Sequence, residues 1–154
     1  MQKMKKVFIT DKTQYGLRVM VMKANGIDNP LLHPLVENRL YRVVYFVEPG
    51  KGVFCTSMAK GVIFLEWMDE GLIPLENPYD HMYLYVEVIR FMSQVDPGTS
   101  RGLVVVGRAK IPIPRVPGTE IKGVFDLVRT HEGKETKPEG CIMISMTLET
   151  ITIM

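Results

Sequence analysis

The side chains that could do chemistry in this sequence are spread out and form no metal-binding motif. His33, His81 and His131 stand in separate connecting segments, without the H-x-x-H or H-E-x-x-H spacing of a zinc site. The two cysteines, Cys55 and Cys141, lie far apart in the chain and have no C-x-x-C spacing. The sequence therefore predicts no resident transition-metal site.

Candidate catalytic groups do not assemble into a site either. Asp69 and Glu70 are adjacent in a predicted strand, so their side chains should point to opposite faces and cannot share one substrate atom. The segment "PGTSRG", with Thr99 and Ser100, lacks the G-x-x-x-x-G-K-[ST] pattern of a phosphate-binding loop. With no nucleophile beside a base and no cofactor loop, we expect no catalytic residue, no cofactor and no enzymatic activity.

Length and charge narrow the class of protein further. A chain of 154 residues fits one domain, residues 1–154. Nineteen basic and seventeen acidic residues give a net charge of +2, which is too balanced to indicate nucleic-acid binding. The N-terminal "MQKMKKVFIT" has too few apolar residues for a secretory signal or a transmembrane segment. We expect a cytoplasmic protein whose two cysteines lie reduced in or near the core.

Strand signals dominate the chain. Segments rich in Val, Ile, Tyr and Phe alternate with connectors rich in Gly, Pro, Asp and Asn, and no apolar stripe of helical period exceeds about two turns. Their spacing of about 8 to 15 residues is typical of an antiparallel sandwich of two sheets. The predicted strands are 6–10, 17–24, 40–48, 52–58, 66–75, 82–91, 103–113, 123–130 and 141–149.

The alternation within these strands predicts which side chains form the core. Leu84, Val86 and Val88 alternate with polar or aromatic residues and should face inward. Trp67 is interpreted as a core anchor and the eleven methionines as adaptable core filler. The same alternation predicts a core face in the last strand, made by Ile142, Ile144, Met146 and Leu148.

The order of several motifs resembles a C2 domain, in particular the small single-domain C2 proteins of plants. The strand "LYVEV" is followed by "VGRAKIPI", and before them stand "YFVEPGKG" and the Trp-centred "WMDE", in the order of that family. The resemblance covers residues 15 to 149. It implies an eight-stranded Greek-key β-sandwich whose loops at one end dock on phospholipid, often through calcium, or on another protein.

The resemblance also shows where the calcium ligands of the family should lie. Asp28 stands in the first loop and Glu37 near the second ligand position, but Arg90 and Met92 occupy the places of the Asp-x-Asp pair. Only Asp96 remains in the third loop. Ca²⁺ needs six to eight oxygens, and a guanidinium supplies none. We therefore expect no strong metal site, and at most a weak one made by Asp28, Glu37 and Asp96.

The third loop carries a different kind of binding material. Apolar side chains next to basic ones favour peripheral membrane contact, although apolar residues that merely cap the sandwich and arginines in solvent explain the same pattern. A second basic group would form a patch on a sheet face, for which a solvated face is the competing interpretation. The predicted loop site comprises Asp28, Arg90, Phe91, Met92, Val95, Asp96 and Arg101, and the predicted patch comprises Lys51, Lys60, Arg108 and Lys110.

These patterns indicate a non-catalytic recognition module. We expect a calcium-independent or calcium-weak adaptor that docks on an anionic phospholipid surface or a protein partner, in the cytoplasm or peripherally on a membrane. The resemblance to plant proteins implies a setting in stress, defence or membrane-traffic signalling. The alternative is a protein–protein scaffold without lipid affinity, which would use an edge strand for pairing.

Overall fold

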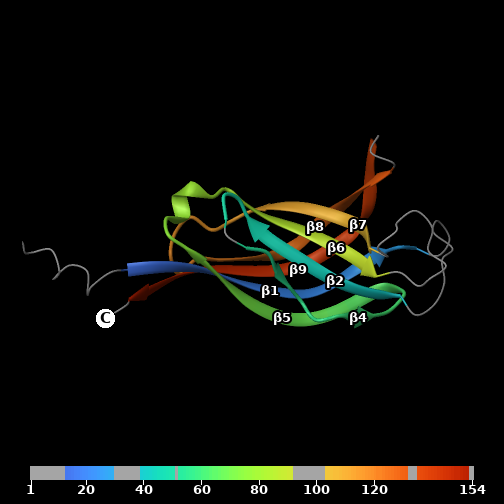
Figure 1. The fold of residues 1–154 in the computed structure, drawn as a ribbon, viewed down its shortest axis with the longest axis horizontal. Coiled ribbons are helices and arrows are strands. Elements are labelled where there is room, and N and C mark those ends of the chain that lie inside the picture. Colours follow the sequence, from blue (N-terminus) through green and yellow to red (C-terminus); the bar gives the residue numbers. More distant parts are fainter. Residues whose placement is uncertain (1–12, 30–38, 51, 92–102, 132–134, 153–154) are drawn as a thin grey trace, which may run out of the picture.

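The computed structural model describes residues 13–29, 39–50, 52–91, 103–131 and 135–152 (Figure 1). Within them lie nine strands and one 3₁₀ turn, η1, and none of their helical segments is long or apolar enough to cross a membrane. The elements are β1 (Thr13–Ile27), β2 (Leu40–Val47), β3 (Phe54–Cys55), β4 (Ala59–Lys60), β5 (Ile63–Leu75), η1 (Pro78–Asp80), β6 (Tyr83–Phe91), β7 (Leu103–Pro112), β8 (Glu120–His131) and β9 (Glu135–Thr152). The predicted strand at 6–10 lies outside the described residues.

The strands form an antiparallel sandwich of two layers. One layer is β2–β6–β7, with β3 and β4 both paired to the outer side of β2, and the other is β8–β9–β1–β5. The layers join where β7 meets β8, at the single pair Arg108 and Val128. Seven long strands and one edge strand in two pieces confirm the predicted eight-stranded sandwich.

The core lies between the two layers and follows the predicted alternation. Leu84, Val86 and Val88 of β6 are buried, and so are the four predicted inward residues of β9. Trp67 is 7 % exposed, and its indole nitrogen donates to the carbonyl of Tyr41 at 3.2 Å. Period-two alternation thus buries one face of each strand, which is the main source of stability in a sandwich of this size.

The edge strand predicted at 52–58 is interrupted for a local reason. Thr56 exchanges two hydrogen bonds with Val43: its amide donates to the Val43 carbonyl, and its hydroxyl accepts from the Val43 amide at 3.0 Å. Ser57 then turns toward β5, where its amide and hydroxyl both donate to the carboxylate of Asp69. Side-chain hydrogen bonds replace the strand ladder here, so β3 and β4 remain short.

Two predictions about sulfur-containing residues are wrong. Cys55 is exposed, because it lies on the outer face of the short β3, while Cys141 is half-buried. Of the described methionines only Met146 is buried, and Met58, Met68 and Met82 are exposed. The β-branched and leucine residues of the strands fill the space between the layers, so the methionines lie mostly on the surface.

One end of the sandwich, called here the loop end, gathers the features discussed below. It is the end at which β1, β6 and β8 finish and β2, β5 and β9 begin, toward the right of Figure 1. The opposite end carries η1 and the connection from β7 to β8, and Arg115 ties these together by donating to the His81 carbonyl at 2.7 Å.

Candidate functional site at the loop end

Asp28, the first residue after β1, is fully buried at the loop end. Its backbone is in the left-handed region, with φ 51°, and Gly26 just before it has φ 82°. Gly140 of β9 has the same φ of 82°, and a Cβ at that position would collide with the carbonyl oxygen of Asn25. Because neither glycine has a side chain, the backbones of β1 and β9 approach closely, which brings Asp28 beside Glu139.

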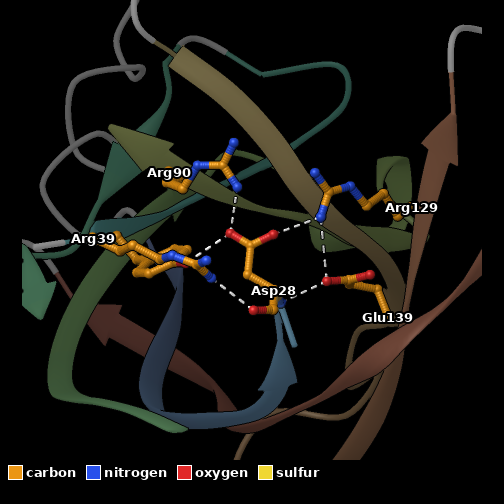
Figure 2. Close-up of polar contacts among 6 residues, drawn as sticks. Asp28, Arg39, Arg90, Arg129 and Glu139 are labelled. Carbon is orange, nitrogen blue, oxygen red and sulfur yellow. Dashed lines mark hydrogen bonds and ion pairs between the residues drawn. The ribbon is translucent and has the colours of Figure 1, made fainter. Parts of the chain in front are cut away.

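The carboxylate of Asp28 accepts three hydrogen bonds from charged or polar side chains (Figure 2). Arg90 donates to Oδ2 at 2.5 Å, and the hydroxyl of Tyr41 donates to the same oxygen at 2.7 Å. Arg129 donates to Oδ1 at 2.6 Å from the other side. Both carboxylate oxygens are therefore occupied by donors of the protein itself.

The backbone of Asp28 is held in the same cluster. Its carbonyl accepts from Nη1 of Arg39 at 2.7 Å, and its amide donates to Oε2 of Glu139 at 2.7 Å. Nη1 of Arg129 also reaches that Glu139 oxygen, at 3.4 Å, so one guanidinium nitrogen links both carboxylates. We call these five charged residues and Tyr41 the Asp28 cluster.

Five separate segments supply the cluster, and their pairing explains why it assembles. Tyr41 and Arg90 are paired across β2 and β6, and both side chains face inward. Arg39 precedes β2, while Arg129 lies in β8 and Glu139 in β9, one hairpin apart. The sheet register therefore brings charges together that are up to 111 residues apart in the chain.

The charge balance of the cluster favours ionised carboxylates. Burial by itself raises the pKa of Asp28, but the hydrogen bonds from Tyr41, Arg90 and Arg129 outweigh this effect and hold the pKa below its ordinary value. Burial and the hydrogen bond to Asp28 raise the pKa of Tyr41, which stays neutral and donates. Three arginines against two carboxylates leave the cluster with a net charge of +1.

This arrangement places a guanidinium where a cation ligand was predicted. Arg90 occupies one oxygen of Asp28 directly, so a metal ion would have to displace a hydrogen-bonded ion pair that is 4 % and 0 % exposed. No group of three or more acidic, histidine or cysteine side chains in the described part of the chain could hold a metal ion. Glu37 and Asp96, the other two predicted weak ligands, lie outside the described residues.

The predicted loop residues are placed as follows. Asp28 and Arg90 are brought together, but both are buried beneath the surface and are paired with each other. Phe91 is half-buried, with the guanidinium of Arg42 5.4 Å from the centre of its ring. Met92, Val95, Asp96 and Arg101 lie outside the described residues.

The predicted basic patch does not gather in one place. Arg108 and Lys110 share the outer face of β7, where Arg108 pairs with Glu87 at 3.1 Å and Lys110 lies 4.5 Å from the ring centre of Tyr83. Lys60 is in β4, on the far side of β2 and β6 from β7 and nearer the loop end. Lys51 lies outside the described residues. The described members are therefore two separate groups of charges.

Four apolar residues that the sequence did not single out are exposed at the loop end. Val62 and Phe64 flank the start of β5 and are 51 % and 50 % exposed. Leu40 begins β2 and pairs with Lys60 of β4, and Met58 immediately precedes β4. Both are also exposed. This turn before β5 is a second connection at the loop end, so apolar surface lies beside the Asp28 cluster.

The residues missed within the cluster are Arg39, Tyr41, Arg129 and Glu139. Arg129 sits at an inward position between residues of predicted strand "GVFDLVRT", and a charged residue at a core position is a sequence signal for a buried ion pair. Glu139 carries no such signal, because it stands in a connector-like segment "ETKPEG" that in fact belongs to β9.

Comparison with known proteins identifies the class of fold. No family model and no curated protein matches the sequence. Among solved structures, a C2 domain of plant extended synaptotagmin 1, the one designated A, is similar with a TM-score of 0.65 and 18 % identity, over 89 % of this chain and 95 % of that one. The fold of this chain is therefore that of a C2 domain, as the sequence motifs predicted.

Two longer proteins contain the same fold as one part. Extended synaptotagmin 2, in a structure of its SMP domain and two C2 domains, is similar with a TM-score of 0.64 and 13 % identity, over 97 % of this chain. Human GIVD cytosolic phospholipase A2 is similar with a TM-score of 0.61 and 15 % identity, over 92 % of this chain. This chain spans 31 % and 17 % of those two proteins, so the likeness concerns a domain of each.

Proposed function

We propose that this C2 domain is a non-catalytic module that docks on an anionic phospholipid surface through its loop end, without calcium. The observation that carries the proposal is the exposed apolar group at that end, Leu40, Met58, Val62 and Phe64, beside a charged cluster whose carboxylates are already neutralised. Similarity to C2 domains of an extended synaptotagmin and a cytosolic phospholipase supports a lipid-facing role.

The apolar group supplies a driving force for membrane contact. Transferring an exposed Val or Phe side chain from water to an apolar medium is worth about 1.5–3 kcal/mol when burial is complete. Two such residues at the tip of one turn, with Lys60 close by to meet anionic headgroups, match the combination of apolar insertion and basic contact that holds peripheral proteins on membranes.

Independence from calcium follows from the Asp28 cluster. A calcium ion that bridges a protein to lipid needs free carboxylate oxygens on the protein side. Both oxygens of Asp28 accept hydrogen bonds from arginines or Tyr41. The setting in plant stress, defence or membrane-traffic signalling is carried into the proposal from the sequence resemblance.

Vesicle co-sedimentation tests the proposal. The protein is mixed with phosphatidylcholine vesicles, with or without about a third of phosphatidylserine, in calcium and in chelator. We expect binding to the anionic vesicles only, equal in calcium and chelator. The double variant Val62→Ser and Phe64→Ser should bind about tenfold more weakly, because its apolar insertion is lost.

Matched controls are available at the opposite end of the sandwich. Tyr79 and Val116 are 64 % and 61 % exposed there, and replacing both with Ser should leave vesicle binding unchanged. Equal losses in both double variants, or no binding of the wild-type protein to any vesicle, would contradict the proposal. The second result would favour the protein–protein scaffold.

A further inference from the structure

We propose that Arg129 and Lys137, on the inner face of the β8–β9 hairpin, form a phosphate-binding site for the headgroup of an anionic lipid. The inference rests on the proposed function, since it assigns the residues that contact the lipid phosphate. It differs from the predicted basic group in the third loop and from the sheet-face patch, because both residues lie in the hairpin at the loop end.

Arg129 has one edge engaged and one edge open. All its printed contacts use Nη1, which donates to Asp28 at 2.6 Å and to Glu139 at 3.4 Å. Within the described part of the chain, Nε and Nη2 have no hydrogen-bond partner. The buried, unpaired side-chain nitrogens there belong to Arg42 and His81, so the open nitrogens of Arg129 still reach solvent. Its side chain is 11 % exposed.

The guanidinium of Arg129 is also fixed in position. Figure 2 shows it beside the carboxylate of Asp28, on the opposite side from Arg90, with Glu139 below it. An arginine that two buried carboxylates already orient has little rotamer freedom left to lose when a ligand binds. Its planar fork can then offer two parallel N–H donors to a phosphate, which is the geometry that favours arginine at such sites.

Lys137 provides the second positive charge. It is the direct cross-strand partner of Arg129 in the β8–β9 ladder, so the two side chains leave the same face of the hairpin with Cβ atoms about 5 Å apart. Lys137 is exposed, and like charges in directly opposite positions are unfavourable without an anion nearby. Adding Lys137 to the Asp28 cluster raises its net charge from +1 to +2.

Phosphate fits this site better than a carboxylate does. A phosphate group carries three oxygen acceptors and up to two negative charges, so it can accept two bonds from the Arg129 fork and a third from the Lys137 ammonium group. The excess charge of +2 matches a phosphodiester headgroup that bears a further carboxylate or phosphate. The site would therefore distinguish anionic lipids from zwitterionic ones.

Two probes test the site separately from the proposed function. Inorganic phosphate is titrated into the protein and followed by melting temperature, with chloride at equal ionic strength as the reference, and anionic vesicles are followed by co-sedimentation. The main variant is Arg129→Lys with Lys137→Ser. A lysine at 129 can still donate to Asp28 and Glu139, so folding is preserved, but it lacks the open edge of the guanidinium. Lys122→Ser, an exposed change in β8 near the opposite end, is the control.

We expect phosphate to raise the melting temperature of the wild-type and Lys122→Ser proteins but not of the Arg129→Lys, Lys137→Ser variant. Anionic vesicle binding of that variant should fall about tenfold, equivalent to about 1.4 kcal/mol. Phosphate binding without vesicle binding would support the site and refute the lipid role. Vesicle binding that depends on Val62 and Phe64 but is unaffected by the Arg129→Lys, Lys137→Ser change would refute the site alone.

Discussion

Replacing Asp28 with Asn removes the central charge of the Asp28 cluster. Asn has nearly the same shape and keeps one acceptor oxygen, so the change acts mainly through electrostatics. Of the two carboxylates, only Glu139 remains against three arginines, and the net charge of the cluster rises from +1 to +2. Since Asp28 is 0 % exposed and Arg90 is 3 % exposed, water cannot compensate for the loss.

The expected cost follows from this burial. Removing one partner of a buried ion pair typically costs about 3–5 kcal/mol of folding free energy. Because Asn retains an acceptor for Arg90 or Tyr41, we take the lower limit, about 3 kcal/mol. For a domain of this length, each kcal/mol lowers the melting temperature by about 2–4 °C, so Asp28→Asn should melt about 6–12 °C below the wild-type protein.

Thermal and urea unfolding, followed by circular dichroism, measure this difference. Glu149→Gln is the matched control, because Glu149 also pairs with an arginine, at 2.6 Å, but on the surface, where ion pairs contribute little. Adding Arg90→Met to Asp28→Asn returns the net charge to +1 and should recover part of the loss. An Asp28→Asn protein as stable as the Glu149→Gln protein would refute the electrostatic account of the cluster.

Three further predictions concern calcium, acid and backbone geometry. Calorimetric titration of the wild-type protein should give no saturable heat at micromolar calcium, and a melting temperature several degrees higher in calcium than in chelator would contradict this. The lowered pKa of Asp28 stabilises the fold above about pH 4, and this contribution is lost as the pH falls through the folded-state value. The urea midpoint of Asp28→Asn should therefore fall less between pH 7 and pH 3 than that of the wild-type protein. Gly140→Ala should destabilise the fold more than Gly118→Ala, because both positions have positive φ but only Gly140 would meet the backbone of β1; equal urea midpoints would exclude the close approach as the reason.

The sequence was sufficient to predict the sandwich, because its information is local. The period-two alternation of β6 and β9 identifies the buried residues without any knowledge of their neighbours, and the turn residues mark most strand ends. The exception is the edge strand around Thr56, where hydrogen bonds to Val43 and Asp69 decide the conformation. Those partners lie 13 and 12 residues away, so no local pattern reports them.

The site was predicted less well, because it depends on register between distant strands. The sequence correctly singled out Asp28 and Arg90 as occupants of a former ligand position, but it treated them as neighbours that repel a metal ion. Their direct ion pair, and the contribution of Arg129 and Glu139, require the β8–β9 ladder and the glycine contact with β1. The exposed Val62 was overlooked because a single apolar residue between two strands has no pattern around it.

The same arginines that exclude a calcium ion also explain how the loop end can keep one shape without it. A bound ion stabilises a site only in proportion to its concentration, since the stabilisation grows with the logarithm of ligand concentration over the dissociation constant. A guanidinium attached through β6 or β8 is present at a fixed distance under all conditions, and Arg90 and Arg129 hold Asp28 from two sides. The positions of Arg129 and Lys137 therefore do not depend on calcium. If the loop end binds anionic lipid as proposed, calcium should affect that binding only by screening the surface charge, as any salt of equal ionic strength and valence does.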